Sequence, residues 1–248
     1  MATAEKKLTK RQQQFKALLE TLPETVTAKD AVETLKKALA SHSKFNESVE
    51  CHIRLGIDVK KADQMVRSTV DLPEGTGKTV RVAVIAKGDK EKEAVAAGAV
   101  LAGGDELIER IQKEPTVLAE FDVLVATPDM MAALAKVARV LGPKGLMPNP
   151  KAGTVTAAVG ETVKALQGGK VEFRADKQGI VHVGIGKRDF TETQLLKNFS
   201  ALYDAILRNK PSGAKGTFVK SVTLSSTMGP GIPVDTTKLA TEIKEYLN

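Results

Sequence analysis

The apolar residues of this chain follow one pattern near both ends and a different pattern in the middle. Near the ends, in 48–57 and 180–185, apolar and polar residues alternate. This period of two is typical of a strand with one buried face. In the middle, 80–86 is a nearly continuous apolar run, which is typical of a strand buried on both faces of a parallel sheet. The chain therefore contains two kinds of architecture.

The middle of the chain alternates between strand and helix patterns. Strands are expected at 80–86, near Val100 and at 122–126, with helices at 89–97, 105–112 and 128–140 and a further helix at 157–167. Strands that alternate with helices form parallel sheets with crossover helices. We therefore predict a small three-layer α/β domain.

The outer segments have the alternating pattern of an α+β domain. Helices are expected at 8–22, after Thr27, at 191–208 and at 236–247, and Thr27 with Asp30 has the spacing of a capping box. Strands are expected at 48–57, 64–72, 171–174, 180–185 and 218–227.

The simplest architecture joins both chain ends into one domain. We predict a mixed α/β and α+β fold in which 1–75 and 170–248 form a discontinuous α+β domain. A Rossmann-like α/β domain at 76–169 is inserted into it. Two glycine-containing linkers, near 71–76 and 167–170, would then lie side by side and act as a hinge.

The charge of the chain lies mainly in these outer segments. The formal net charge is +7, but 76–169 holds 12 basic and 11 acidic residues, whereas the rest holds 25 and 19. This basic excess favours a polyanionic partner for the outer domain. With seven Phe, two Tyr and no Trp, a single-strand binder built on stacked aromatic residues is not expected.

The sequence indicates a soluble protein. No apolar run approaches the roughly 20 residues that a membrane span requires, and the first residues are polar and basic, unlike a secretory signal. We therefore expect a cytoplasmic protein without a membrane partner.

No enzyme signature is present, and we expect no catalytic residues, metal or cofactor. The stretch Gly75-Thr76-Gly77-Lys78-Thr79 resembles a phosphate loop, but Leu72 stands where the first glycine is needed and the stretch precedes a strand. Cys51 shares the parity of apolar neighbours and is expected in the core. His52 and His182 fall on polar strand faces as solvated or hydrogen-bonded side chains; a catalytic pair is the alternative.

Two stretches are candidates for binding. The loop 142–153 is rich in proline and glycine and carries Lys144 and Lys151, so it is either a structural connector or a preformed binding loop. The last strand places hydroxyls on one face and ends in a turn at 228–230. Such a face can donate to phosphate and to the ribose 2′-hydroxyl, or it is an ordinary exposed strand face.

Several stretches resemble one known family. They are Lys44–Glu50, Leu55–Asp58, Val125–Asp129, Leu141–Thr154, Lys215–Phe218 and Ser226–Pro230. Over about 10–232 and in this order, they resemble the family of the bacterial large-subunit ribosomal protein numbered one. The resemblance implies a two-domain fold with one domain inserted in the other.

The resemblance also implies partners. It implies binding to a helical junction of large-subunit ribosomal RNA at the mobile lateral stalk, and assistance in releasing deacylated tRNA from the exit site. It further implies repression of translation of the protein's own messenger RNA. The rival interpretations are a nucleotide-binding enzyme that uses the α/β domain and a general nucleic-acid coat protein.

The RNA-binding residues that the resemblance implies lie in the outer segments. We expect Phe45 and Met228 to make apolar contacts with ribose or bases, and the hydroxyls to donate to backbone oxygens. Basic side chains would supply the salt-dependent part of binding. Ser48 stands where some relatives have threonine, which keeps the hydroxyl. The full set, including further polar residues of the same strand face, is Lys44, Phe45, Ser48, Glu50, Arg54, Glu172, Arg174, Asp176, Lys177, Gly179, Ser221, Thr223, Ser225, Thr227, Met228 and Gly229.

Overall fold

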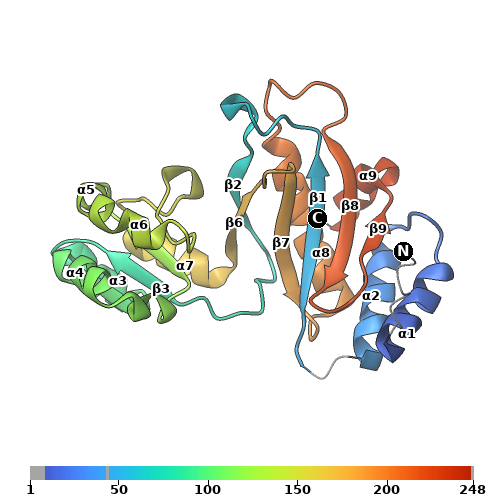
Figure 1. Ribbon diagram of the computed structural model, residues 1–248, viewed down its shortest axis with the longest axis horizontal. Coiled ribbons are helices and arrows are strands. Elements are labelled where there is room, and N and C mark those ends of the chain that lie inside the picture. Colours follow the sequence, from blue (N-terminus) through green and yellow to red (C-terminus); the bar gives the residue numbers. More distant parts are fainter. Residues whose placement is uncertain (1–8, 43–44, 247–248) are drawn as a thin grey trace, which may run out of the picture. The chain divides into compact units, whose positions relative to one another are not determined.

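The computed structural model describes residues 9–42 and 45–246 (Figure 1). Contacts divide the chain into two compact units, which are described separately. Unit 1 consists of Met1–Val66 and Phe173–Asn248, and unit 2 is Arg67–Glu172. The mixed helix and strand content confirms the predicted fold class. That 76–169 forms an inserted domain with those boundaries stays a prediction.

Unit 1 is built on a four-stranded antiparallel sheet. Its strand order is β7 (Ile180–Lys187), β1 (Ser48–Leu55), β8 (Val219–Ser226) and β9 (Ile232–Val234). Strand β1 pairs with β7 on one side and β8 on the other. A strand from the first part of the chain is thus hydrogen-bonded between two strands from the last part (Figure 1).

One face of this sheet is covered by helices. Helices α2 (Ala28–His42), α8 (Glu192–Arg208) and α9 (Thr236–Tyr246) pack on its strands, and α1 (Lys10–Glu20) precedes them in the chain. Alternate β1 residues, including Cys51 and Ile53, are fully buried there, as the alternation predicted. Thr27 donates to Asp30 Oδ2 at 2.7 Å and accepts from the Asp30 amide at 3.2 Å, which confirms the predicted helix cap.

The edge strand β9 was not expected from the sequence. Pro233 interrupts its short apolar pattern, and proline removes a donor from a ladder. The structure accommodates Pro233 because β9 lies at the sheet edge, with Pro233 opposite Thr223 of β8.

Unit 2 has the predicted three layers. Its parallel sheet has the order β4 (Leu101–Gly103), β3 (Val82–Ile85) and β5 (Val123–Ala126). Val82 and Val84 pack with helices α3 (Asp89–Ala96) and α7 (Val159–Gly168). Ala83 and Ile85 belong to a separate core with α4 (Asp105–Lys113) and the segment 128–141. Alternate residues of one strand therefore face two helical layers.

The helix expected at 128–140 is a chain of short segments. These are the 3₁₀ turns η3 (Pro128–Met130) and η4 (Ala135–Val137) and the helices α5 (Met131–Leu134) and α6 (Ala138–Leu141). Residues 130, 134, 137 and 141 are nevertheless all buried in one core, at helical spacing. The remaining 3₁₀ turns are η1 (Ala62–Gln64), η2 (Pro115–Ala119) and η5 (Pro150–Ala152).

The two glycine-containing linkers lie side by side. Strands β2 (Arg67–Asp71) and β6 (Lys170–Arg174) form a two-stranded sheet, and the Leu72 amide donates to the Gly169 carbonyl at 3.1 Å. A Cβ on Gly169 would lie 2.7 Å from the Gly75 Cα, so this approach requires glycine. The hinge function stays a prediction.

Within the described residues, no helix is both long and apolar enough to cross a membrane.

The loop 142–153 is braced from within. Leu146 and Met147 pack against the core of unit 2. The Asn149 side chain accepts from the Lys151 amide at 2.8 Å, and the Asn149 amide donates to Thr154 Oγ1 at 2.8 Å. These contacts explain the loop as a structural connector, and a binding role stays a prediction.

Candidate nucleic-acid interface

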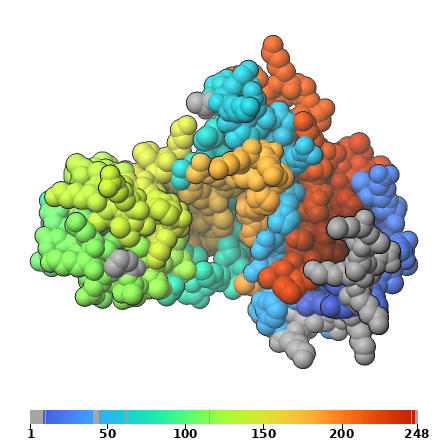
Figure 2. Space-filling view, viewed as in Figure 1, coloured from blue at the N-terminus to red at the C-terminus, as the bar shows by residue number. Residues whose placement is uncertain are grey.

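The sheet of unit 1 has one face that carries polar side chains and is left open by α2, α8 and α9. We call it the polar face and define it by Glu50, His52 and Arg54 of β1, His182 and Gly184 of β7, and Ser221, Thr223 and Ser225 of β8. These residues are exposed or half-buried, while their strand neighbours are buried except for the exposed Lys220 beside Ser221. In Figure 2, atoms of β7, β1 and β8 lie side by side at the surface.

The register of the sheet brings these residues into rows. His52 lies opposite His182 on one side and Thr223 on the other. Glu50 lies opposite Gly184 and Ser225 in the same way. Gly184 leaves open space, because a Cβ built on it meets no atom within 4 Å. The predicted hydroxyls of β8 therefore share one surface with Glu50 and Arg54.

Glu47 organises the turn that follows β8. Its side chain is fully buried, although it carries a charge. Its carboxylate accepts from Arg11 Nη2 at 2.9 Å, from the Ser226 hydroxyl at 2.8 Å and from the Met228 amide at 3.1 Å. A buried charge is tolerated when it is paired and hydrogen-bonded. Glu47 thus fixes 226–228 against the start of β1.

Backbone and hydroxyl groups complete this turn. The Ser48 amide donates to Thr227 Oγ1 at 3.0 Å, and the Thr227 amide donates to the Ser48 carbonyl at 3.1 Å. Lys187 Nζ donates to Ser48 Oγ at 2.7 Å. A Cβ on Gly229 would lie 2.3 Å from Ser226 Oγ, so glycine is required there for packing. We call Phe45, Glu47, Ser48 and 226–229 the strand-end turn.

Two apolar side chains of this turn are exposed. Phe45 is 51% exposed and Met228 is 56% exposed. The Glu47 amide donates to the Phe45 carbonyl at 3.0 Å, and Met228 donates its amide to the Glu47 carboxylate. Glu47 therefore holds the backbone at both Phe45 and Met228, so these two large apolar side chains are presented at the surface from a fixed backbone.

The segment between β6 and β7 forms a tight turn around Asp176. Asp176 Oδ1 accepts from the amides of Gln178 and Ile180, each at 2.8 Å. Gly179 adopts the left-handed conformation that this turn requires, with φ 75°. The backbone hydrogen bond from Ile180, then those from Gln178 and His182, lower the pKa of the Asp176 carboxyl.

This turn borders a hollow with basic groups. Its lining includes Val59 and Met65 together with Arg174, Asp176 and Lys177. Arg174 and Lys177 are exposed, so both predicted cations are accessible. Glu172 is placed differently, because it lies in β6 of unit 2 and pairs with Arg67. Lys44 lies outside the described residues.

The histidines of the polar face form a row of contacts. His52 Nδ1 lies 2.8 Å from His182 Nδ1, and His52 Nε2 lies 2.8 Å from Ser225 Oγ. His182 Nε2 lies 3.5 Å from Asp176 Oδ2. Burial, followed by the proximity of His182, lowers the pKa of His52, while Glu50 opposes this shift. The prediction of hydrogen-bonded side chains is confirmed.

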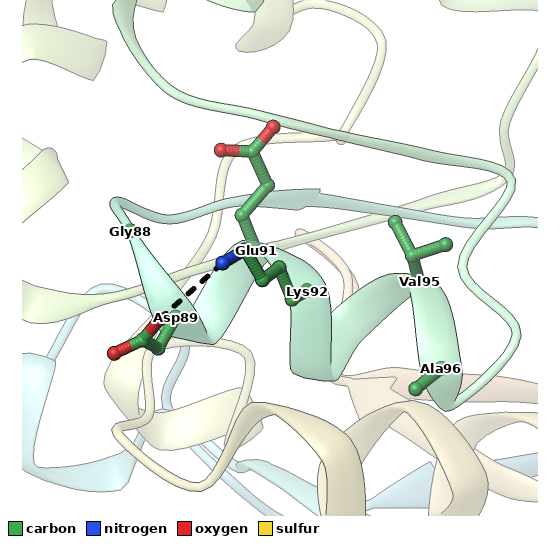
Figure 3. Close-up of a pocket in the computed structure, with 6 residues that line it drawn as sticks. All are labelled: Gly88, Asp89, Glu91, Lys92, Val95 and Ala96. Carbon is green, nitrogen blue, oxygen red and sulfur yellow. Dashed lines mark ion pairs between the residues drawn. The ribbon is translucent and has the colours of Figure 1, made fainter.

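Unit 2 offers a poor site for a nucleotide. The carboxyl end of β3 leads through Gly88 to the start of α3, where a doubly wound fold would bind phosphate. The first turn of α3 contains Asp89 and Glu91, which repel an anion. Figure 3 shows the hollow at this helix, where Asp89 pairs with Lys92 at 3.8 Å. No group of three metal-binding side chains occurs among the described residues.

Most predicted residues of unit 1 are thus brought into three adjoining regions. Ser48, Thr227, Met228, Gly229 and Phe45 form the strand-end turn. Glu50, Arg54, Ser221, Thr223 and Ser225 lie on the polar face. Asp176, Lys177 and Gly179 form the turn before β7, and Asp176 contacts the polar face through His182.

The sequence interpretation assigned no binding role to four residues that hold these regions together. They are Arg11, Glu47, His52 and Lys187. His182 was likewise given no role in binding. A sequence signal existed for the histidines, since both fall on polar strand faces. Nothing local marks Glu47 as buried, because its partners are far away in the chain.

In unit 1, an open polar sheet face lies beside a hydrogen-bonded turn with two exposed apolar side chains. Such a surface suits a structured polyanion better than a small-molecule substrate, and this defines the class of protein. Comparison with known proteins then places the chain. Residues 34–230 match the model of the ribosomal protein L1p/L10e family. The chain belongs to this family, whose proteins are structural components and not enzymes.

Three similar relatives bear the same name, large ribosomal subunit protein uL1. The protein of Frankia casuarinae is 57% identical over 195 residues, which cover 79% of this chain and 81% of the relative. That of Frankia alni is 50% identical over 238 residues, covering 95% and 98%. That of Prochlorococcus marinus is 51% identical over 229 residues, covering 92% and 95%. The resemblance noted in the sequence is confirmed.

Proposed function

We propose that this ribosomal protein is a structural constituent of the large ribosomal subunit, where the polar face and the strand-end turn bind its ribosomal RNA. The relatives are named as proteins of that subunit. RNA in folded form is recognised through its shape, its phosphates and its 2′-hydroxyls. A surface of hydroxyls and histidines with cations at its borders matches those groups.

The observation that carries the proposal is the buried Glu47 under the strand-end turn. A buried carboxylate is costly unless every acceptor site is used, and here it fixes the backbone beneath Ser48, Thr227 and Met228. A rigid backbone lowers the entropy that binding must overcome. The turn therefore presents Phe45 and Met228 ready for contact with ribose and base surfaces.

The cations surround this turn and the polar face. Lys187 lies at Ser48, Arg54 lies on β1, and Arg174 and Lys177 border the neighbouring hollow. Such groups contribute affinity that falls as salt concentration rises. The hydroxyls of β8 on the same face can distinguish RNA from DNA through the 2′-hydroxyl.

The test compares exposed apolar residues in the two units. We expect Phe45→Ala to weaken binding to a large-subunit RNA fragment of the lateral stalk by about 5- to 150-fold, because stacking of a base on an aromatic side chain contributes roughly 1–3 kcal/mol. Met228→Ala should also weaken binding, through loss of its apolar contact. The matched controls are Val95→Ala and Val100→Ala in unit 2, which are 60% and 51% exposed. Equal affinities for all four variants would contradict the proposed interface.

The finer role that we propose is action at the mobile lateral stalk. There the protein would assist the release of deacylated tRNA from the exit site. Ribosomes reconstituted with the Met228→Ala variant should bind that variant less tightly than ribosomes bind the native protein. They should also release deacylated tRNA more slowly. Normal release by ribosomes that lack the protein altogether would contradict this role.

We also propose that the same surface represses translation of the protein's own messenger RNA. A message that imitates the ribosomal site would compete for the same residues. A reporter placed behind the native leader should be repressed by the native protein and by Val95→Ala, but not by Met228→Ala. Repression that is independent of Met228 would separate this activity from ribosomal RNA binding.

A general nucleic-acid coat protein is the rival interpretation. It would bind through phosphates alone and show little preference among RNAs. A competition assay at physiological salt decides between the two, because the proposed function requires the stalk fragment to be preferred over random RNA of equal length.

A further inference from the structure

His52 and His182 occupy the centre of the polar face. They lie directly opposite each other on β1 and β7, with ring centroids 5.0 Å apart and planes at 62°. Their Nδ1 atoms are 2.8 Å apart, so one nitrogen must carry a hydrogen and the other a lone pair. The two rings therefore act as one unit, and the state of one fixes that of the other.

The neighbours decide which nitrogen carries the hydrogen when both rings are neutral. Asp176 Oδ2 only accepts, so His182 Nε2, at 3.5 Å, carries its hydrogen towards it. His182 Nδ1 then has a lone pair, and His52 Nδ1 donates to it. His52 Nε2 is left as an acceptor, and the hydroxyl of Ser225, 2.8 Å away, donates to it. In each hydrogen bond of this row, the donor is therefore the group nearer Ser225 and the acceptor is the group nearer Asp176.

One added proton reverses the contact at Ser225. If the charge lies on His182, its Nδ1 donates to His52, and the neutral His52 carries its hydrogen on Nε2. If the charge lies on His52, both of its nitrogens carry hydrogens. In either case Ser225 Oγ now accepts from His52 Nε2, and its own hydrogen is free to donate to another group. A second proton would remove the bond between the rings.

The charged groups that face the pair come from β1 and from the turn before β7. Glu50 and Arg54 flank His52 on β1, and Asp176 and Lys177 belong to the turn before β7. Strand β8 contributes the hydroxyls of Ser221, Thr223 and Ser225, and its charged residue Lys220 is exposed beside Gly56. Burial of His52, followed by the nearby His182, lowers the pKa of His52 and so favours its neutral form in the absence of an anion.

We propose that the His52–His182 pair is a phosphate-binding site of the polar face, which takes up one proton when an RNA phosphate binds there. The proposal rests on the proposed RNA-binding function. The bound phosphate gains a cationic ring beneath it and a hydroxyl donor from Ser225. The open space above Gly184, next in line on β7, gives the RNA backbone room to approach.

The proton positions are tested first in the free protein. Long-range ¹H–¹⁵N spectra distinguish the two imidazole tautomers, and the chain has only three histidines. Above neutral pH, we expect His52 with its hydrogen on Nδ1 and His182 with its hydrogen on Nε2. A hydrogen on Nε2 of neutral His52, or on Nδ1 of neutral His182, would overturn the proposed row of hydrogen bonds.

The linked proton is tested by calorimetry of RNA binding. At about pH 7, titrations of the stalk RNA fragment in two buffers of different ionisation enthalpy should show uptake of up to one proton. Affinity should rise as pH falls from about 8 to 6, by no more than about tenfold per pH unit, which is the limit for one linked proton. The variant H52Q/H182Q, measured with the same RNA, corrects for titration of the RNA itself.

Single variants separate the parts of the site. His52→Gln should reduce proton uptake, because only His182 remains to take up the proton, whereas Ser225→Ala should retain uptake but lose affinity at low pH. Tight binding by the native protein without proton uptake would overturn this inference and leave the proposed function intact. Absence of binding to the stalk fragment at every pH would refute the proposed function, and this inference with it.

Discussion

Replacement of Glu47 by glutamine should loosen the strand-end turn without changing its shape. In the native protein the buried carboxylate accepts from Arg11, Ser226 and Met228. A glutamine side chain has one oxygen and one amino group. If the oxygen faces Met228, the amino group faces the Arg11 guanidinium; if it faces Arg11, the amino group faces the Met228 amide. Either orientation leaves a donor without an acceptor.

The cost follows from the bonds that are lost. A hydrogen bond to a charged group contributes roughly 1.5–3 kcal/mol, so Glu47→Gln should destabilise unit 1 by about 2–3 kcal/mol. Complete removal in Glu47→Ala leaves Arg11 partly buried without its partner and should cost about 3–5 kcal/mol. Glutamine is therefore the better test, because the fold should survive.

Hydrogen exchange measured by NMR reads out the site directly. The Met228 amide donates to Glu47, so its exchange should accelerate about 30- to 150-fold if opening becomes easier by roughly 2–3 kcal/mol. The control is Glu24→Gln, since Glu24 is exposed. Unchanged exchange at Met228 and an unfolding free energy within about 0.5 kcal/mol of the native value would refute the assigned role of Glu47.

Three further predictions address other parts of the molecule. The variant Gly184→Val should fold normally, because the new side chain enters open space, but it should weaken RNA binding by at least about tenfold because it obstructs the polar face. The control Gly168→Val, also in open space but in unit 2, should bind RNA normally. Equal RNA affinities of the two variants would contradict this prediction. Hydrogen bonds from Arg81 and then Lys78 hold the pKa of the Asp122 carboxyl well below its usual range. These contacts therefore stabilise unit 2 fully at pH values above the ordinary aspartate pKa of about 3.9. The stabilisation is lost as the pH falls through the lower pKa of the folded state. Urea midpoints should therefore show Asp122→Asn less stable than the native protein at about pH 6 and nearly equal to it at strongly acid pH, whereas a constant difference would contradict the ion pair. Burial raises the pKa of the Cys51 thiol far above its ordinary value, so a thiol reagent should react only when unit 1 opens, and rapid labelling of the folded protein would contradict its core position.

The sequence predicted most of the fold because its signals are local. The alternation around Cys51 and the continuous run that contains Val84 each reflect how a strand is buried, and both interpretations are confirmed. The edge strand around Pro233 was missed because proline weakens the local pattern while its neighbour β8 supplies the pairing. The helix expected from Pro128 to Val140 is instead a series of short helical segments.

The site could be predicted only in part, for a different reason. The parity of β8 correctly placed Thr223 and Ser225 on one face. The contacts of Glu47 with Ser226 and of His52 with His182 join residues far apart in sequence. They depend on the register of antiparallel strands, which no single segment determines. The family resemblance supplied Phe45 and Met228, whose exposure in the structure is compatible with the expected contacts.

The most direct test of the central claim is cross-linking of the native protein to the stalk RNA by ultraviolet light, with the linked peptides identified by mass spectrometry. If unit 1 holds the RNA on its polar face and strand-end turn, cross-links should concentrate on the peptides containing Phe45, Met228 and the central residues of β1 and β7. Cross-links confined to unit 2, Arg67–Glu172, would contradict the account.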